Sequence, residues 1–398
     1  MQAVAAEHGL PSRQSRCGLI TIRRPSSASA GRAGGRGPAL PEVSSRQPAR
    51  PSAPAAALRE WPPARPGPPR LESARIRVIP SAPQPKDGPM SEPPAPTGLA
   101  ALDPTKRPAG AMTMAYKDHY FLQRWVDYYS RQFGREHLYV LSHGGDPEHD
   151  RICEGANVIT LPRDPTMFRM DRRRWSFISQ FSAGMMRYYN WFIVGDVDEV
   201  VIVDPAVAPD LVTYLGRYSN SKTAPASLCP FGIELIHNPE AEPEPLSDDA
   251  PILSRRRVFR ANANYAKPCV LRKETGFTIG GHANSHQPRV LDPHLYLVHL
   301  RFFDHDMVTE RLAGRKGMRA TMAGNRDLKD VGKAWGKDLE TFLALSKGVA
   351  VREDAELPEF RKRMVDEQQH LHDGKITFFG GGRSKSLFRL PDRFASVF

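Results

Sequence analysis

The sequence predicts an α/β fold in which helices cover both faces of a mostly parallel β-sheet, and three observations indicate it. Strand-like and helix-like segments alternate between residues 111 and 203. The run Trp191–Val194 is apolar, as in a parallel strand that is buried on both faces. Polar residues follow several of the predicted strands, which is where open α/β sheets bind their ligands.

The first half of the chain carries the clearest alternation. Asp118 suits a helix N-cap, and apolar side chains recur at helical spacing after it until Gly134 ends the pattern. The predicted order is strand 112–116, helix 118–133, strand 138–141, strand 157–161, helix 174–189 and strand 191–194, followed by an apolar run over 200–203. Such an order is typical of an open, largely parallel sheet.

The second half is less regular. It predicts a helix over 208–218, strands over 226–236, 267–272 and 295–303, a Gly- and His-rich loop over 277–286, and mostly helix over 306–350. The residues after 357 predict one charged helix and a Gly-rich, aromatic tail. We therefore expect an α/β domain over 111–320 and a helical C-terminal extension over 321–398.

Residues 1–110 differ from the rest in composition. They hold 21 of the 37 prolines, and 16 basic against 7 acidic residues give them a net charge of +9. A segment with so little apolar periodicity is predicted to be disordered. Three interpretations of residues 1–110 stay open: a basic interaction tail, a linker to a partner, or sequence upstream of the true translation start. Under the third interpretation, Met90, Met112 and Met114 are alternative start residues.

Composition argues against several classes of function. The arm accounts for most of the total charge of +12, so the remainder is close to neutral and lacks the basic balance of a nucleic-acid-binding domain. The four cysteines, Cys17, Cys153, Cys229 and Cys269, are scattered and predict neither a zinc site nor a disulfide framework. No apolar run is long enough for a membrane span. We expect a cytoplasmic protein, and any association with a membrane would be peripheral or through a partner.

An acidic cluster follows the strand Trp191–Val194. Asp196 and Asp198 lie on the same side of an extended backbone, and Glu199 comes directly after them. Two carboxylates at the end of a buried strand repel each other, and a divalent cation that also binds phosphate oxygens would relieve the repulsion. The alternative is a solvated acidic turn.

Three further polar groups follow predicted strands. They are Lys117 with Asp118, the loop His143–Asp146, and the loop His282–His286 with the nearby His299. A doubly wound sheet would bring them to the edge that carries the acidic cluster. Separately, each has an ordinary explanation: a helix cap, a turn, or structural histidines.

Two stretches resemble the family-2-like glycosyltransferases of the GT-A fold, including the glycosyltransferase family 92 branch. Residues 112–129 read MTMAYKDHYFLQRWVDYY and resemble the opening strand and helix of that family. The stretch WFIVGDVDEV, residues 191–200, is similar to its "DxDE" segment. The resemblance covers roughly 112–320, and the Asp-Val-Asp-Glu segment is its most specific part. Lys-Asp-His stands at 117–119 where Lys-Asn-Glu is usual.

The resemblance implies a hexosyltransferase that uses a nucleotide-sugar donor and Mn²⁺ or Mg²⁺. Asp198 would bind the metal, Asp196 the metal or the ribose, and His282 the metal or the diphosphate. Asp118 and Asp146 would lie near the nucleoside. The acceptor would be a glycan, a lipid-linked sugar or a polysaccharide, as in polysaccharide biosynthesis.

The catalytic base is not fixed by the resemblance. An inverting transfer needs a base within hydrogen-bond distance of the acceptor hydroxyl, and Glu234, in the strand that contains Phe231 and Gly232, is our candidate. Two alternative functions stay open. One is a metal-dependent phosphohydrolase or nucleotidyltransferase that uses the same carboxylates, and the other is a noncatalytic carbohydrate-binding protein on the same fold.

Overall fold

The structure is a computed structural model that describes residues 102–163, 169–218, 224–287, 289–311, 344–345, 347–352, 357–371 and 376–398. The predicted disorder of the N-terminal arm therefore lies outside the described residues, apart from 102–110. Most of the helical region predicted over 306–350 also lies outside them.

Strands and helices alternate in the first part of the described chain, as the sequence predicts. The strands are β1 (Arg107–Ala115), β2 (Leu138–His143), β3 (Asn157–Leu161), β4 (Tyr189–Val194), β5 (Glu199–Val203), β6 (Ser227–Ile236), β7 (Val258–Ala261), β8 (Val270–Leu271), β9 (Val290–Phe302), β10 (Val351–Arg352), β11 (Gln369–Leu371), β12 (Ile376–Phe378) and β13 (Leu387–Arg389). The α-helices are α1 (His119–Phe133), α2 (Pro147–Ile152), α3 (Met170–Met185), α4 (Leu211–Leu215), α5 (Ile252–Arg255) and α8 (Leu357–Asp366). Residues 305–311 are also helical.

One mixed sheet organises the described part of the chain. Its strand order is β10-β13-β7-β6-β8-β4-β1-β2-β3, with β9 beside β6 and β5 beside β9. The four strands β4, β1, β2 and β3 are all parallel, which confirms the predicted α/β class. Beyond β4 the pairing is mostly antiparallel, although β6 runs parallel to β9, and β10 to β13.

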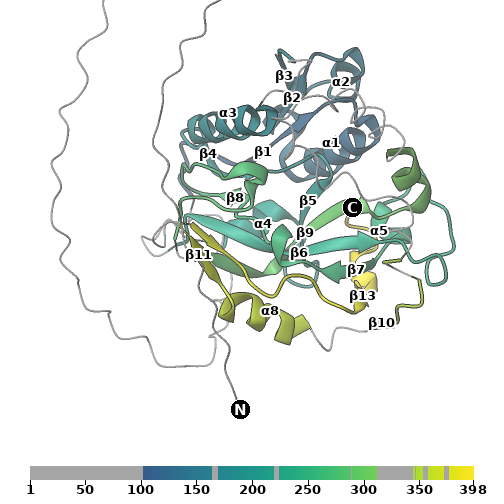
Figure 1. Ribbon diagram of the computed structural model, residues 1–398. Helices are drawn as coiled ribbons and strands as arrows, with labels where there is room; N and C mark the ends of the chain where they lie inside the picture. Colours follow the sequence, from purple (N-terminus) through teal and green to yellow (C-terminus); the bar gives the residue numbers. More distant parts are fainter. Residues whose placement is uncertain are drawn as a thin grey trace, which may run out of the picture. The chain divides into compact units, whose positions relative to one another are not determined.

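Helices α1 and α3 cover opposite faces of the parallel strands (Figure 1). Alternation along the strands produces this arrangement, because neighbouring residues of a strand point to opposite faces. In β1, Ala111 packs into the cluster that holds Trp125 of α1, whereas Met112 packs with Trp175 of α3. The two layers leave the carboxyl ends of β1 and β4 side by side.

The first strand begins earlier than predicted. Arg107 already pairs with Tyr189 of β4, so the segment 107–110 belongs to the fold and not to the arm. These residues lack large apolar side chains because β4 and η2 (Arg135–His137) lie close. A Cβ atom at Gly110 would come within 2.9 Å of the Tyr189 ring. The strand therefore carries no apolar pattern at the point where it starts.

The C-terminal residues do not form the purely helical extension that we expected. Helix α8 is present, but β13 pairs with β7 in the main sheet, and the side chains of Phe388, Phe394 and Phe398 are buried in the main core. Strands of two or three residues are too short to show an alternating pattern, so the sequence did not indicate them.

Gly232 of β6 lies against a neighbouring backbone, so adding a single methyl group at this position is expected to lower the stability of the protein strongly. A Cβ atom there would come within 2.4 Å of the Asn262 carbonyl oxygen and 2.5 Å of the Tyr265 backbone. Gly232→Ala is expected to lower the free energy of unfolding by about 3 kcal/mol, measured by urea denaturation. Gly184→Ala is the control, because nothing lies within 4 Å of its added Cβ in α3. It should raise stability by about 0.5–1 kcal/mol. Equal effects of the two substitutions would contradict the close packing.

Candidate active site

The chain leaves β1 through a strained turn. Lys117 and Asp118 both have positive φ angles, 59° and 42°, although neither is glycine. His149 Nε2 donates a hydrogen bond to the Lys117 carbonyl oxygen at 2.9 Å, and the Leu122 amide donates to the Asp118 carbonyl oxygen at 3.0 Å. Backbone strain held in this way is concentrated at functional sites.

Asp118 does not act as the helix cap that its position suggests. It occupies the N-cap position of α1, but its side chain makes no capping hydrogen bond. Its carboxylate instead accepts a hydrogen bond from Arg311 at 3.2 Å, and the same guanidinium donates to Asp198 at 3.0 Å. Arg311 also lies over the Phe121 ring, 4.0 Å from its centroid. Burial alone would lower the pKa of Arg311, but the two carboxylates outweigh burial and raise it.

Asp196 has different partners from Asp198. Its carboxylate accepts a short hydrogen bond from Arg174 of α3 and lies 3.5 Å from the Lys267 ammonium. Burial and the neighbouring Asp198 act to raise the pKa of Asp196, but the two cations outweigh them and lower it. Asp196 and Asp198 are therefore neutralised by different cations.

Glu199 lies in a buried ion pair. The Lys267 ammonium donates to both Glu199 oxygens, at 2.6 and 2.8 Å, and each side chain is only 3% exposed. Burial raises the pKa of Glu199, although Lys267 opposes the shift. Lys267 thus links Glu199 to Asp196 and fixes the loop between β4 and β5.

Glu234 does not suit the role of catalytic base. It is 1% exposed, and Arg260 donates two hydrogen bonds to it, at 2.8 and 2.5 Å. Burial would raise its pKa, but His299, with Nδ1 3.6 Å away, and Arg260 together lower the pKa to about 2. A carboxylate that is so weakly basic and so enclosed cannot readily take a proton from a substrate.

His119, Asp146 and His149 form a candidate metal-binding group, with ligand atoms that all lie within 4.8 Å of one another. His119 Nε2 lies 2.8 Å from Asp146 Oδ2, and His149 Nε2 lies 3.9 Å from the same oxygen. His149 would bind a metal through Nε2 only after it gives up its hydrogen bond to the Lys117 carbonyl oxygen. Sequence reasoning singled out Asp146 but missed both histidines, whose spacing matches no metal motif.

His282 does not join the two aspartates in a comparable group. In the part of the chain that the structure describes, Asp196, Asp198 and His282 do not bring their ligand atoms within 4.8 Å of one another. The His282 ring instead donates from Nδ1 to the Asn264 carbonyl oxygen at 2.9 Å. Burial, followed by the charge of Lys267, lowers the pKa of His282 to about 4. The expected metal-binding trio is thus not assembled.

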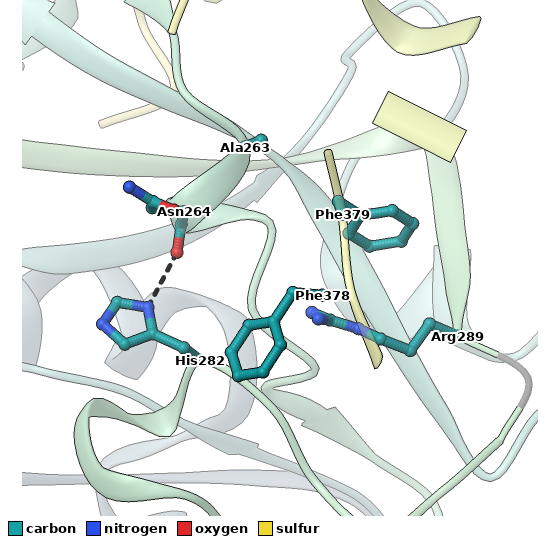
Figure 2. A pocket seen from close by; sticks show the side chains of 6 residues that line it. All are labelled: Ala263, Asn264, His282, Arg289, Phe378 and Phe379. Atoms are coloured by element: carbon teal, nitrogen blue, oxygen red, sulfur yellow. Dashed lines mark hydrogen bonds between the residues drawn. The ribbon is translucent and has the colours of Figure 1, made fainter. Parts of the chain in front are cut away.

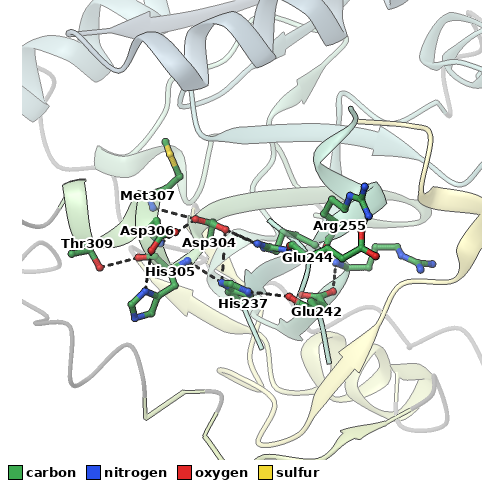
Figure 3. A network of polar contacts seen from close by, with 11 residues as sticks. His237, Glu242, Glu244, Arg255, Asp304, His305, Asp306, Met307 and Thr309 are labelled. Atoms are coloured by element: carbon green, nitrogen blue, oxygen red, sulfur yellow. Dashed lines mark hydrogen bonds and ion pairs between the residues drawn. The ribbon is translucent and has the colours of Figure 1, made fainter. Parts of the chain in front are cut away.

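A polar network anchors the helix that carries Arg311 (Figure 3). Asp304 Oδ1 accepts from the amides of Asp306 and Met307, where the helix begins. Asp304 Oδ2 accepts two hydrogen bonds from the buried Arg256, at 3.2 and 2.7 Å. The His305 amide donates to His237 Nδ1 at 3.0 Å. These contacts fix the start of the helix, and therefore the direction in which Arg311 extends.

Arg174, Lys267 and Arg311 complete the site, and sequence reasoning missed all three. They come from α3, from the segment before β8 and from the helix after β9, far from the acidic cluster in sequence. Only one signal was available: a buried acidic cluster requires positive partners. The sequence does not show which of its many basic residues supply them.

Comparisons with known proteins do not assign the chain to a family. No family model matches it, and no curated protein matches it. Among solved structures it is similar to the crystal structure of a mannose-1-phosphate geranyltransferase from Thermus thermophilus, with 10% sequence identity over 59% of this chain and 67% of that chain, and a TM-score of 0.20. Nothing in these comparisons supports the glycosyltransferase family 92 branch.

None of the described helices is both long enough and apolar enough to cross a membrane.

Proposed function

We propose that the protein is a GT-A-type glycosyltransferase that moves a hexose from a nucleotide sugar to a hydroxyl acceptor with the help of Mn²⁺ or Mg²⁺. The observation that carries the proposal is the convergence of Asp118, after β1, and Asp198, after β4, on one guanidinium. Two carboxylates from adjacent parallel strands that share one positive centre have the oxygen donors that such cations bind. The carboxyl ends of these strands are also where α/β sheets bind nucleotides.

The charges around this centre suit a diphosphate. Arg174, Lys267 and Arg311 surround the acidic cluster with positive groups, each held in place by a carboxylate. When bound, the divalent cation would neutralise charge on the departing diphosphate. Asp198 would hold the cation, Asp196 the cation or the ribose, and Asp118 the nucleoside side. We propose that residues 102–311 make up this catalytic domain and that the acceptor is a glycan, a lipid-linked sugar or a polysaccharide.

Nucleotide binding tests the proposal. With Mn²⁺ present, at least one nucleoside diphosphate at about 100 times its Kd should stabilise the protein by about 2.7 kcal/mol, observed as a rise in Tm. His119→Ala should be measured in parallel, because it removes any stabilisation by metal at the His119, Asp146 and His149 group. Absence of a metal-dependent shift with every nucleoside diphosphate would contradict the proposal. Release of the nucleoside diphosphate from a nucleotide sugar at a rate independent of acceptor would indicate a hydrolase instead.

A further inference from the structure

A cavity of about 240 Å³ lies near the proposed active site (Figure 2). It is bordered by η3 (Ala263–Tyr265), by the loop around η4 (Ile279–Gly281) and by the end of β12. Its lining residues are Ala263, Asn264, His282, Arg289, Phe378 and Phe379. Pockets for drug-sized ligands have roughly 300–1,000 Å³, so this smaller space suits a group of the size of one sugar residue.

Arg289 brings a positive charge to this cavity, and its guanidinium lies over the Phe379 ring, 4.6 Å from the ring centroid. It is 8% exposed, and its guanidinium donates to two carbonyl oxygens, of Thr377 at 2.6 Å and of Ala266 at 2.5 Å. Its Nε atom is buried and has no hydrogen-bond partner. Within the described ranges Arg289 forms no ion pair with a carboxylate. Burial raises the pKa of the neighbouring Cys229 thiol although Arg289 opposes the shift, so this thiol supplies no anion.

Three other enclosed arginines differ from Arg289 because each of them pairs with a carboxylate. Arg256 pairs with Asp304, Arg260 with Glu234, and Arg174 with Asp196. A buried charge that lacks an opposite charge is costly, and proteins normally pair it. Arg289 faces the cavity, and this placement indicates that a ligand supplies its counter-charge.

The opposite side of the cavity offers a hydrogen-bond acceptor. His282 donates from Nδ1 to the Asn264 carbonyl oxygen, which can only accept, so the Nε2 lone pair remains available. Among the residues that the structure describes, Nε2 has no hydrogen-bond partner. Figure 2 shows the Phe378 ring between His282 and the Arg289 guanidinium, where it presents an apolar face. An anion-binding group, an apolar ring face and a hydroxyl acceptor therefore surround one small space.

The cavity lies beside the acidic cluster. Burial and then the charge of Lys267 lower the pKa of His282, whereas Asp196 acts to raise it, so both charges lie close enough to act on the ring. Gly281, next to His282, lies against Trp175 of α3, one residue after the Arg174 that pairs with Asp196. A molecule in the cavity would thus lie near the proposed donor site.

We propose that this cavity is the acceptor subsite and that it takes a sugar carrying an anionic group, either a carboxylate or a phosphate. Arg289 binds the anion, Phe378 packs on the sugar ring, and His282 Nε2 accepts a hydrogen bond from the acceptor hydroxyl. This assignment rests on the proposed glycosyltransferase function, since it names the acceptor class of that same site.

Calorimetric titration of the full chain tests the subsite without nucleotide. Glucuronate, glucose 6-phosphate and glucose are the probes, and inorganic phosphate tests the anion alone. At least one of the two anionic sugars should bind 10-fold or more tightly than glucose. Tighter binding of glucuronate would identify the preferred anion as a carboxylate, and tighter binding of glucose 6-phosphate would identify it as a phosphate. Arg289→Gln should remove that preference, and His282→Gln should weaken all three sugars while the preference remains. Arg257→Gln, which removes an arginine that pairs with the exposed Asp392, is the matched control.

Two results would overturn the assignment. One is glucose binding as tightly as both anionic sugars, and the other is a preference that survives Arg289→Gln in a folded variant. If Arg289→Gln does not fold, the wild-type protein can be tested at increasing NaCl concentration. Its preference for the anionic sugar over glucose should fall as the salt screens the charge of Arg289. A preference that does not change with salt would contradict the role of Arg289. Metal-dependent nucleotide binding should persist in Arg289→Gln. Failure of the subsite and failure of the donor site are therefore distinguishable.

Discussion

Asp198→Asn is expected to lower the rate of sugar transfer by about a thousandfold. A bound divalent cation contributes several kcal/mol to stabilisation of the transition state, and each ~1.4 kcal/mol corresponds to a factor of ten in rate. The amide has a similar shape, but it lacks the charge that holds the cation and that pairs with Arg311. The measurement is kcat/KM with the nucleotide sugar that gives the largest thermal shift.

Asp127→Asn is the matched control for this experiment. Asp127 lies on α1, accepts a hydrogen bond from Gln123 and lies 3.9 Å from Arg135, so it has ordinary helix-surface partners. It should keep kcat/KM within about twofold of the wild type, since surface substitutions have small effects. Equal activity of Asp198→Asn and the wild type would instead support a noncatalytic role for the site.

Lys267→Met is expected to lower the free energy of unfolding by about 3–5 kcal/mol. It removes the ammonium from a buried pair and leaves Glu199 enclosed and without its main counter-charge. Urea denaturation at neutral pH gives the value, provided that the slope of the transition stays unchanged.

The double variant Lys267→Met/Glu199→Gln separates the lost charge from lost packing. It removes both charges, so it should regain a substantial part of the stability that the single variant loses. A double variant as unstable as the sum of both single variants would show that Lys267 and Glu199 act independently. That result would contradict the Lys267–Glu199 ion pair as the cause of the stability loss in Lys267→Met.

The sequence was sufficient to predict the parallel half of the sheet because its signals are local. Buried parallel strands are continuous apolar runs, as in β4, and amphipathic helices such as α1 repeat at a fixed spacing. The antiparallel half combines strands of very different length, from β8 to β9, and its pairing depends on contacts that no short window contains.

The candidate site was only partly predictable for a related reason. Asp118, Asp196 and Asp198 could be found because strand ends in an α/β sheet meet at one edge. The roles of neighbouring carboxylates could not be assigned, because they depend on which cation reaches each of them. Glu234 illustrates this, since Arg260 converts a candidate base into one half of a buried ion pair.

The pairing of β1 with β4 also has a kinetic consequence. These strands are adjacent in space, with Met112 opposite Val194, but β2, β3, α1, α2 and α3 all lie between them in sequence. Closing such long loops costs chain entropy before native contacts compensate for it, so folds rich in distant pairings form slowly. Asp118 and Asp198 come together only when this pairing is complete. The gain of nucleotide binding during refolding should therefore lag behind the formation of helical signal.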